Sequence, residues 1–139
     1  MDKVTRKFAG NYRNLALIGD FIIEITSNEG FSGKDVYAIQ TAVDEACANI
    51  IDHAYQGENI GDIIITLVSF PKYIKIIIED SGTPFDPDSV PAPDITSPLE
   101  IRKERGLGVF FIRKLMDEAI FDFSSPKGNT LTLIKNKRS

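Results

Sequence analysis

The sequence predicts an α/β (α+β) fold, a two-layer sandwich in which a mostly antiparallel sheet is covered by three helices. Strand-like runs come in consecutive pairs joined by short turns, which favours antiparallel pairing. The helical segments each carry an apolar stripe, and such a stripe has to be buried against another layer. A chain of 139 residues with 42% hydrophobic residues can build one core without disulfides. We therefore expect residues 1–139 to form a single domain.

The expected elements follow one another in the order β-α-α-β-β-loop-α-β-β. Apolar residues recur at three- and four-residue steps, as in helices that bury one face, in segments 11–28, 33–55 and 107–119. Runs rich in β-branched residues indicate strands at 3–8, 63–68, 73–79, 120–124 and 129–135. Short turns rich in proline and glycine separate the strands of each pair, which supports hairpins.

Residues 81–105 do not fit either period. They hold five prolines and several acidic residues, so neither a regular helix nor a strand is expected there. A loop of this length inside a compact domain is usually a functional lid or a disordered segment. We expect a lid loop over about 81–105.

Composition excludes several classes of function. With a net charge of −4 and no basic run interleaved with aromatic residues, we expect no direct nucleic-acid binding. No apolar run approaches membrane-spanning length and the N-terminus is polar, so we expect a cytoplasmic protein without a membrane anchor. The single cysteine, Cys47, lies in an apolar stretch and is expected to be a small core residue. The basic residues 135–138 are expected to form a solvated tail.

The helix predicted over 33–55 carries unusual chemistry. Glu45 and Asn49 are four residues apart, so their side chains project from the same face. Ala38 and Ala42 on that face leave room above the backbone, while Ile39 and its helical neighbours turn toward the core. This face of the helix is expected to be the wall of a pocket.

A second polar segment follows a predicted strand. Asp80 presents a carboxylate where the chain turns, and it could accept a hydrogen bond from an exocyclic amine. Gly82 lets the backbone approach a ligand closely. Taken alone, Asp80-Ser81-Gly82 also fits an ordinary turn.

A third segment, residues 105–109, opens the last helix. Free backbone N–H groups and the positive end of the helix dipole make such a helix start a natural anion site. Two glycines would let phosphate oxygens approach the backbone, although a lone Gly-x-Gly also fits a hinge. Neither the P-loop pattern nor the dinucleotide-binding pattern of glycines is present.

Together the three segments resemble the motifs of one superfamily. Glu-x-x-x-Asn at 45–49, Asp-x-Gly at 80–82 and Gly-Leu-Gly at 106–108 are similar to the N, G1 and G2 boxes of the GHKL (histidine kinase-like) ATPases. Gly128-Asn129-Thr130 resembles the fourth element of that superfamily.

A narrower resemblance covers nearly the whole chain. The segments 14–18, 45–55, 80–87 and 106–118 are similar to those of the bacterial anti-sigma-factor serine/threonine-protein kinases. Pro84 stands where the wider superfamily has a second glycine, which that kinase subgroup tolerates. The resemblance implies a Bergerat fold that binds Mg-ATP. Asn49 would hold Mg²⁺, and Glu45 would be the general base that accepts the proton of a substrate serine.

The resemblance implies further roles. Asp80 would bind the adenine amino group of ATP, with Gly82 beneath the base and Thr130 supporting the contact through water. Arg105 would either reach a phosphate or face water, and the ring of His53 would either support the pocket or lie exposed. The residues implied to cradle the phosphates are Gly106, Leu107, Gly108 and Val109.

The implied function is a kinase and anti-sigma factor. It would phosphorylate a STAS-domain anti-sigma antagonist on serine, and it would sequester a sigma factor in a partner-switching circuit. The resemblance also implies a homodimer, for which the exposed face of the first strand and first helix is the candidate contact. The alternatives are a nucleotide-gated binding module with little kinase activity, a kinase for a target other than a sigma-factor circuit, and a scaffold without nucleotide.

Overall fold

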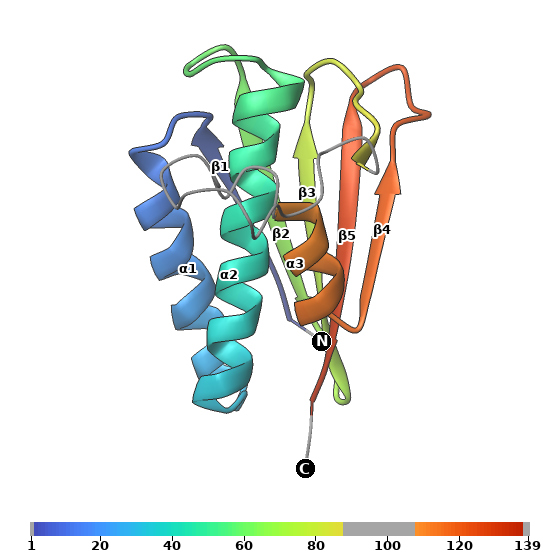
Figure 1. The fold of residues 1–139 in the computed structure, drawn as a ribbon. Helices are drawn as coiled ribbons and strands as arrows, with labels where there is room; N and C mark the ends of the chain where they lie inside the picture. The colour runs from blue at the N-terminus through green and yellow to red at the C-terminus, as the bar shows by residue number, and fades with distance from the viewer. Residues whose placement is uncertain (1, 88–107, 138–139) are drawn as a thin grey trace, which may run out of the picture.

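A computed structural model describes residues 2–87 and 108–137 (Figure 1). Its five strands form one sheet in the order β1-β2-β3-β5-β4, and every neighbouring pair is antiparallel. The strands are β1 (Asp2–Ala9), β2 (Asp62–Ser69), β3 (Tyr73–Asp80), β4 (Glu118–Asp122) and β5 (Asn129–Asn136).

Three helices cover one face of this sheet (Figure 1). They are α1 (Asn14–Asn28), α2 (Gly33–Asn49) and α3 (Gly108–Leu115). No described helix or strand covers the other face (Figure 1). The predicted α+β fold with an antiparallel sheet and three helices is therefore confirmed. None of the described helices is long and apolar enough to cross a membrane.

The core lies between the sheet and the helices. Alternate residues of a strand point to opposite faces, so β2 and β3 direct every second isoleucine toward the helices. Ile65, Ile76 and Ile78 have no solvent-exposed surface, and Ile22 and Ile39 meet them from α1 and α2. Cys47 is equally buried, as predicted, and burial raises the pKa of its thiol.

Helix α2 lies between α1 and α3 (Figure 1). Ala38 and Ala42 are consequently buried, so the small-residue face is closed by packing along most of its length. Further along the helix, Ala46 belongs to the buried core and also lines a cavity beside Asn49. Small side chains on this helix thus serve close helix packing as well as a pocket.

The end of the second helix differs from the prediction of a regular helix to Tyr55. The α-helix ends at Asn49 and continues as one π-helical turn, η1 (Ile50–Ala54). The Tyr55 N–H donates to the Ile50 carbonyl at 2.8 Å, a five-residue step instead of the usual four. Single π-turns of this kind are frequent at functional sites.

Two C-terminal predictions were wrong. The third helix ends at Leu115 instead of Ala119, because residues 118–122 pair with β5 as strand β4. Lys135 is not part of a solvated tail but belongs to β5 and is 6% exposed. Its ammonium donates to the Leu115 carbonyl at 2.6 Å and lies 3.9 Å from the Asp35 carboxylate, which compensates for its burial.

Candidate functional site

The carboxamide of Asn49 is the clearest mark of a binding site. Asn49 ends α2 and is 2% exposed. Neither Oδ1 nor Nδ2 has a hydrogen-bond partner among the described residues. A buried polar group without a partner costs about 1–3 kcal/mol. Such a group is therefore expected to meet a ligand, and its oxygen is of the type that Mg²⁺ prefers.

Two other predicted residues flank Asn49 along the chain. Glu45 lies one turn earlier on α2 and is partly exposed, so it is closer to solvent than Asn49. His53 lies in η1, where its ring centroid is 5.5 Å from that of Phe85. The His53 Nε2 atom is buried and has no hydrogen-bond partner in the described part of the chain.

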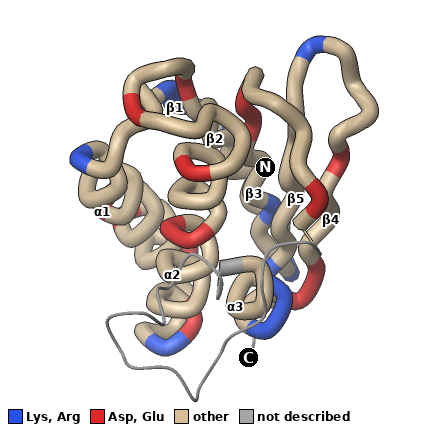
Figure 2. Tube along the Cα trace, turned by 45° about the horizontal axis from the view of Figure 1, so that its top comes forward, with Lys and Arg blue, Asp and Glu red and all other residues tan. Residues whose placement is uncertain are grey.

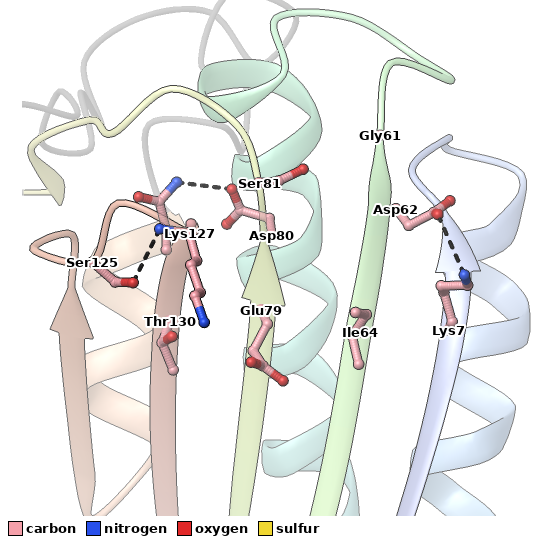
Figure 3. Close-up of a pocket in the computed structure, with 12 residues that line it drawn as sticks. Lys7, Gly61, Asp62, Ile64, Glu79, Asp80, Ser81, Ser125, Lys127 and Thr130 are labelled. Carbon is pink, nitrogen blue, oxygen red and sulfur yellow. Dashed lines mark hydrogen bonds and ion pairs between the residues drawn. The ribbon is translucent and has the colours of Figure 1, made fainter.

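Asp80 lies at the end of β3, beside the beginning of β5 (Figure 3). Its Oδ1 accepts from the Gly82 N–H and from the Asn129 amide, both at 2.8 Å. Burial raises the pKa of the Asp80 carboxyl, and these two hydrogen bonds oppose that rise. Because both bonds end on Oδ1, Oδ2 is available to accept from a ligand.

Asn129, named in the sequence analysis only as part of the fourth element, donates directly to the Asp80 carboxylate. Asn129 is paired with Asp80 across β3 and β5, and its amide also donates to the Gly82 carbonyl at 3.0 Å. Thr130 is the next residue, so its side chain points to the outer face of the sheet, beside Glu79 (Figure 3). Thr130 also borders the cavity of Asn49 and Asp80, and its predicted role stays a prediction. The sequence could have identified Asn129 only if the register that places it opposite Asp80 had been known.

Gly82 is needed for a close approach between two backbone segments. A Cβ at this position would lie 2.7 Å from the carbonyl carbon and oxygen of Ala54 in η1. The next residue, Thr83, donates its N–H to the same Ala54 carbonyl at 2.8 Å. The segment after Asp80 is thus held directly against the π-turn that follows Asn49.

One cavity between α2 and the sheet brings the predicted residues together. Asn49 and Asp80 both line it, which places the N-box and G1-box segments at one site. Its remaining walls are Ala46, Ile50, Phe85, Phe121, Phe123, Asn129, Thr130 and Leu131. The sequence analysis identified none of the three phenylalanines, because apolar side chains in a predicted loop and strand carry no specific signal.

The cavity is narrow in this structure. It offers about 20 Å³ to water-sized groups, whereas small-molecule sites usually have roughly 300 Å³ or more. The ring of Phe85 closes it, since it lies 5.4 Å from the ring of Phe123 and 5.5 Å from that of His53. The polar groups fit a nucleotide, whereas the space in this structure is smaller than such a ligand needs.

Comparison with known proteins identifies the family. The model of the histidine kinase-like ATPase domain matches residues 8–135. The chain belongs to this family. It is also 31% identical over 121 residues to the serine-protein kinase RsbW of Bacillus cereus strain AH187, covering 84% of this chain and 75% of that protein. RsbW of Bacillus thuringiensis strain Al Hakam is similar to the same extent. Within the family, the chain therefore belongs with the RsbW-type serine-protein kinases.

Solved structures share the fold of this chain. The structure of the RsbU and RsbW domains of Rv1364c from Mycobacterium tuberculosis superposes with a TM-score of 0.70 at 15% identity. The whole of this chain is covered, and it spans 34% of that longer chain. The catalytic domain of the histidine kinase ThkA superposes with a TM-score of 0.55 at 17% identity and is covered over 99% of both chains.

The G2-box segment of this histidine kinase-like ATPase is only partly visible. Arg105, Gly106 and Leu107 lie outside the described residues, as does most of the predicted lid loop. Gly108 is the first residue of α3, and Val109 is buried. The part that is described thus begins a helix, as the anion-site prediction requires, and its role in phosphate binding stays a prediction.

Proposed function

We propose that the protein is a cytoplasmic serine/threonine-protein kinase. It uses Mg-ATP to phosphorylate a STAS-type anti-sigma antagonist on serine, and it sequesters a sigma factor in a partner-switching circuit. Membership of the histidine kinase-like ATPase family supports ATP binding, and relatives named serine-protein kinase support transfer to serine. The observation that carries the proposal is the buried, unpartnered carboxamide of Asn49 on the same cavity as Asp80.

The chemistry of the site divides between its two ends. At the inner end, the Asn49 Oδ1 would hold Mg²⁺, which when bound neutralises charge on the transferring phosphoryl group. At the other end, the Asp80 Oδ2 accepts a hydrogen bond from the adenine amino group. The N–H groups at the start of α3, including those of Gly108 and Val109, would contact phosphate oxygens. Asn49 and Asp80 thus fix the two ends of the nucleotide.

Glu45 is proposed to act on the protein substrate. It lies one helical turn before Asn49, and the residue is partly exposed although its Oε2 atom is buried. In this proposal, a serine hydroxyl approaches the carboxylate from the solvent side while the phosphates are held near Asn49. The carboxylate accepts the hydroxyl proton as the serine oxygen attacks the γ-phosphorus and ADP leaves. A protein that only binds ATP would have no need of this base.

The decisive variant is Glu45→Ala. We expect its affinity for Mg-ATP to stay close to that of the wild type, whereas phosphoryl transfer to the antagonist is abolished, because the base is lost and the nucleotide contacts are kept. The measurements are calorimetric ATP binding and transfer of labelled phosphate to STAS proteins encoded near this gene. Glu24→Ala, at an exposed glutamate of α1, is the matched control.

The outcomes separate the alternatives. Undiminished transfer by Glu45→Ala would show that the base is another group. A wild-type protein that binds ATP but transfers phosphate to no antagonist would be a nucleotide-gated binding module, and transfer only to an antagonist from another circuit would exclude a sigma factor as the target. A scaffold would show no thermal shift with millimolar Mg-ADP, whereas a ligand at about 100 times its Kd stabilises by about 2.7 kcal/mol.

We also propose a homodimer, formed through the outer face of the sheet. The sequence analysis placed the contact on β1 and α1 together, but β1 turns Phe8 toward Phe21 of α1, so their exposed faces lie on opposite sides of the molecule. The outer face of β1 continues across the other strands instead. Its middle row consists of Thr5, Thr66, Ile77, Thr132 and Ile120.

The charges on this face are arranged asymmetrically. Lys3 and Lys7 lie on the β1 edge, and Glu118 and Asp122 lie on the β4 edge. Figure 2 shows acidic positions along β4. Lys3 shares its row with Glu118, and Lys7 shares its row with Asp122. A two-fold axis parallel to the strands would lay β1 of one copy over β4 of the other, so Lys3 and Lys7 would each face an acid. Lys75 and Glu79 of the central strand β3 share these two rows and would each lie near their own copy. The complementary charges of the two edge strands favour a second copy of the chain as the partner of this face.

A further inference from the structure

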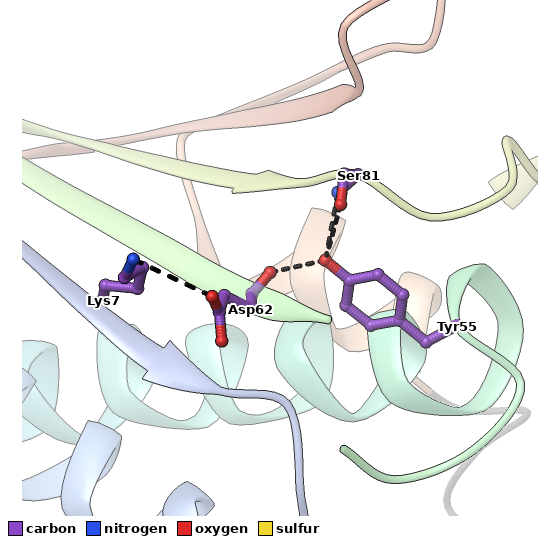
Figure 4. A network of polar contacts seen from close by, with 4 residues as sticks. All are labelled: Lys7, Tyr55, Asp62 and Ser81. Atoms are coloured by element: carbon purple, nitrogen blue, oxygen red, sulfur yellow. Dashed lines mark hydrogen bonds and ion pairs between the residues drawn. The ribbon is translucent and has the colours of Figure 1, made fainter. Parts of the chain in front are cut away.

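The end of the π-turn connects the two halves of the candidate site. Asn49 precedes η1, and Tyr55 follows it. Figure 4 shows the Tyr55 ring extending from the end of η1 to the strand ends, where its hydroxyl lies between Asp62 and Ser81. Asp62 begins β2, and Ser81 is the residue directly after Asp80.

The hydroxyl of Tyr55 both donates and accepts a hydrogen bond. It donates to the Asp62 carbonyl at 2.5 Å and accepts the Ser81 N–H at 3.0 Å. The Ser81 hydroxyl lies 3.4 Å away. Since a phenol has one O–H to donate, the Ser81 groups act as its donors. Tyr55 is 8% exposed, so these bonds are shielded from competing water.

These hydrogen bonds connect β2 and β3 where their backbone pairing has ended. The pairing of β2 with β3 ends at Ile64 and Glu79, before Asp62 and Ser81 come opposite each other. Beyond that point, the Tyr55 hydroxyl is the described link between the two strands. The backbone that carries Asp80 is therefore held on one side by Asn129 and on the other by Tyr55.

Two glycines make room for the Tyr55 ring. A Cβ at Gly61 would lie 2.5 Å from a ring carbon of Tyr55, and a Cβ at Gly10 would lie 2.8 Å from the Gly61 carbonyl oxygen. The Gly10 N–H donates to that same carbonyl at 2.9 Å. The ring is thus packed closely by backbone, which fixes where its hydroxyl lies.

We infer that Tyr55 is a positioning residue for base recognition, holding the Asp80 carboxylate in the orientation that selects an adenine amino group. This inference rests on the proposed nucleotide site. Tyr55 does not line the cavity with Asn49 and Asp80, so it acts through the Ser81 backbone and not by touching the nucleotide. Tyr55 thereby connects the π-turn that follows Asn49 to the backbone that carries Asp80.

The test is Tyr55→Phe, which keeps the ring between the glycines and removes only the hydroxyl. The measurement is the ratio of Kd for Mg-IDP to Kd for Mg-ADP, because inosine carries a carbonyl where adenine carries the amine. We expect Tyr55→Phe to bind Mg-ADP about 3- to 10-fold more weakly, with Mg-IDP little changed, so the ratio falls. Tyr73→Phe, at the opposite end of β3, is the matched control and keeps the wild-type ratio.

The possible results test the role of Tyr55 and the proposed nucleotide site separately. If the wild type binds Mg-ADP in preference to Mg-IDP and Tyr55→Phe keeps the full preference, or weakens both nucleotides equally, Tyr55 does not orient Asp80. If the wild type binds neither nucleotide, the proposed site itself is wrong. Should Tyr55→Phe fail to fold, Gly61→Ala decides in its place, because its Cβ displaces the Tyr55 ring and must lower the same ratio.

Discussion

At the scale of single residues, the protonation of Asp80 is set by opposing effects. Burial raises the pKa of its carboxyl, while the Asn129 amide and the Gly82 N–H lower it, and burial prevails. A protonated Asp80 cannot serve as a full acceptor for an adenine amine. Asn129 and Gly82 thus keep the acid closer to its charged, binding form than burial alone would allow.

The raised pKa of Asp80 predicts a pH dependence of stability. Between the unfolded value of about 3.9 and the raised pKa, the folded protein binds more protons than the unfolded chain. The resulting stabilisation is complete below about pH 3.9 and is lost as pH rises through the raised pKa. Asp80→Asn removes it, so the free energy of unfolding of the variant should increase relative to wild type as pH rises from about 4 through the raised pKa.

Urea unfolding at a series of pH values measures this difference. Asp20→Asn, at an exposed position of α1, controls for the change from acid to amide. A difference between Asp80→Asn and wild type that stays constant, or that moves the other way, would show that burial does not dominate at Asp80.

The sequence identified some residues of the site and missed others for a physical reason. Asn49 and Asp80 could be found because each is a polar residue at the end of an apolar element. Asn129 and Thr130 could not be told apart, because both are polar and a one-residue shift in a strand turns a side chain to the other face. The strand register, which pairs Asn129 with Asp80, is a property of the folded sheet.

At the scale of the elements, α2 is anchored at the end far from the site. The Ser32 hydroxyl accepts the Asp35 N–H at 3.2 Å, which satisfies one of the free N–H groups of the first turn. Asp35 also lies in that turn, where a negative charge is favourable. The cap stabilises the helix without any contact to Asn49 at its other end.

Ser32→Ala should therefore separate stability from binding. We expect the free energy of unfolding to fall by about 1 kcal/mol, the usual cost of losing such a cap. Nucleotide affinity should stay within about twofold, because the folded site is unchanged. Urea unfolding and calorimetry measure the two quantities, with Ser27→Ala near the end of α1 as the control. A large loss of affinity in Ser32→Ala would mean that the two ends of α2 are coupled.

The elements whose boundaries the sequence missed are those decided by tertiary contacts. The apolar spacing of 33–55 continues through Tyr55, so the sequence gives no sign of the π-turn. Ala54 and Tyr55, at the end of that turn, make tertiary contacts that only the folded structure shows. Residues 116–121 suit a helix and a strand equally well. Pairing with β5 decides for a strand, and it buries part of Ala119 and Phe121 against the core.

At the scale of the whole molecule, the order of strands and helices followed from local periodicity, because each element buries one face against the other layer. Local sequence patterns could not indicate whether the outer face of the sheet binds a partner. That face became interpretable only when the register placed lysines on one edge and acids on the other.

The proposed dimer predicts a charge-reversal pair. Lys3→Glu should weaken dimerisation by roughly tenfold, because each reversed charge acts twice in a symmetric dimer. Combining Lys3→Glu with Glu118→Lys should restore it, since the two positions would face each other across the interface. Sedimentation equilibrium measures the dissociation constant, with Lys34→Glu on the helical side as the control. A double variant weaker than either single variant would exclude this orientation of the two sheets.

The phenylalanine ring between His53 and Phe123 has a consequence for the rate at which a nucleotide enters. If the base of the proposed nucleotide takes the place of this ring, it enters only molecules in which Phe85 has moved, and the observed dissociation constant equals the intrinsic one divided by the fraction that is open. The on-rate would then level off at high nucleotide concentration, at the frequency with which that side chain moves.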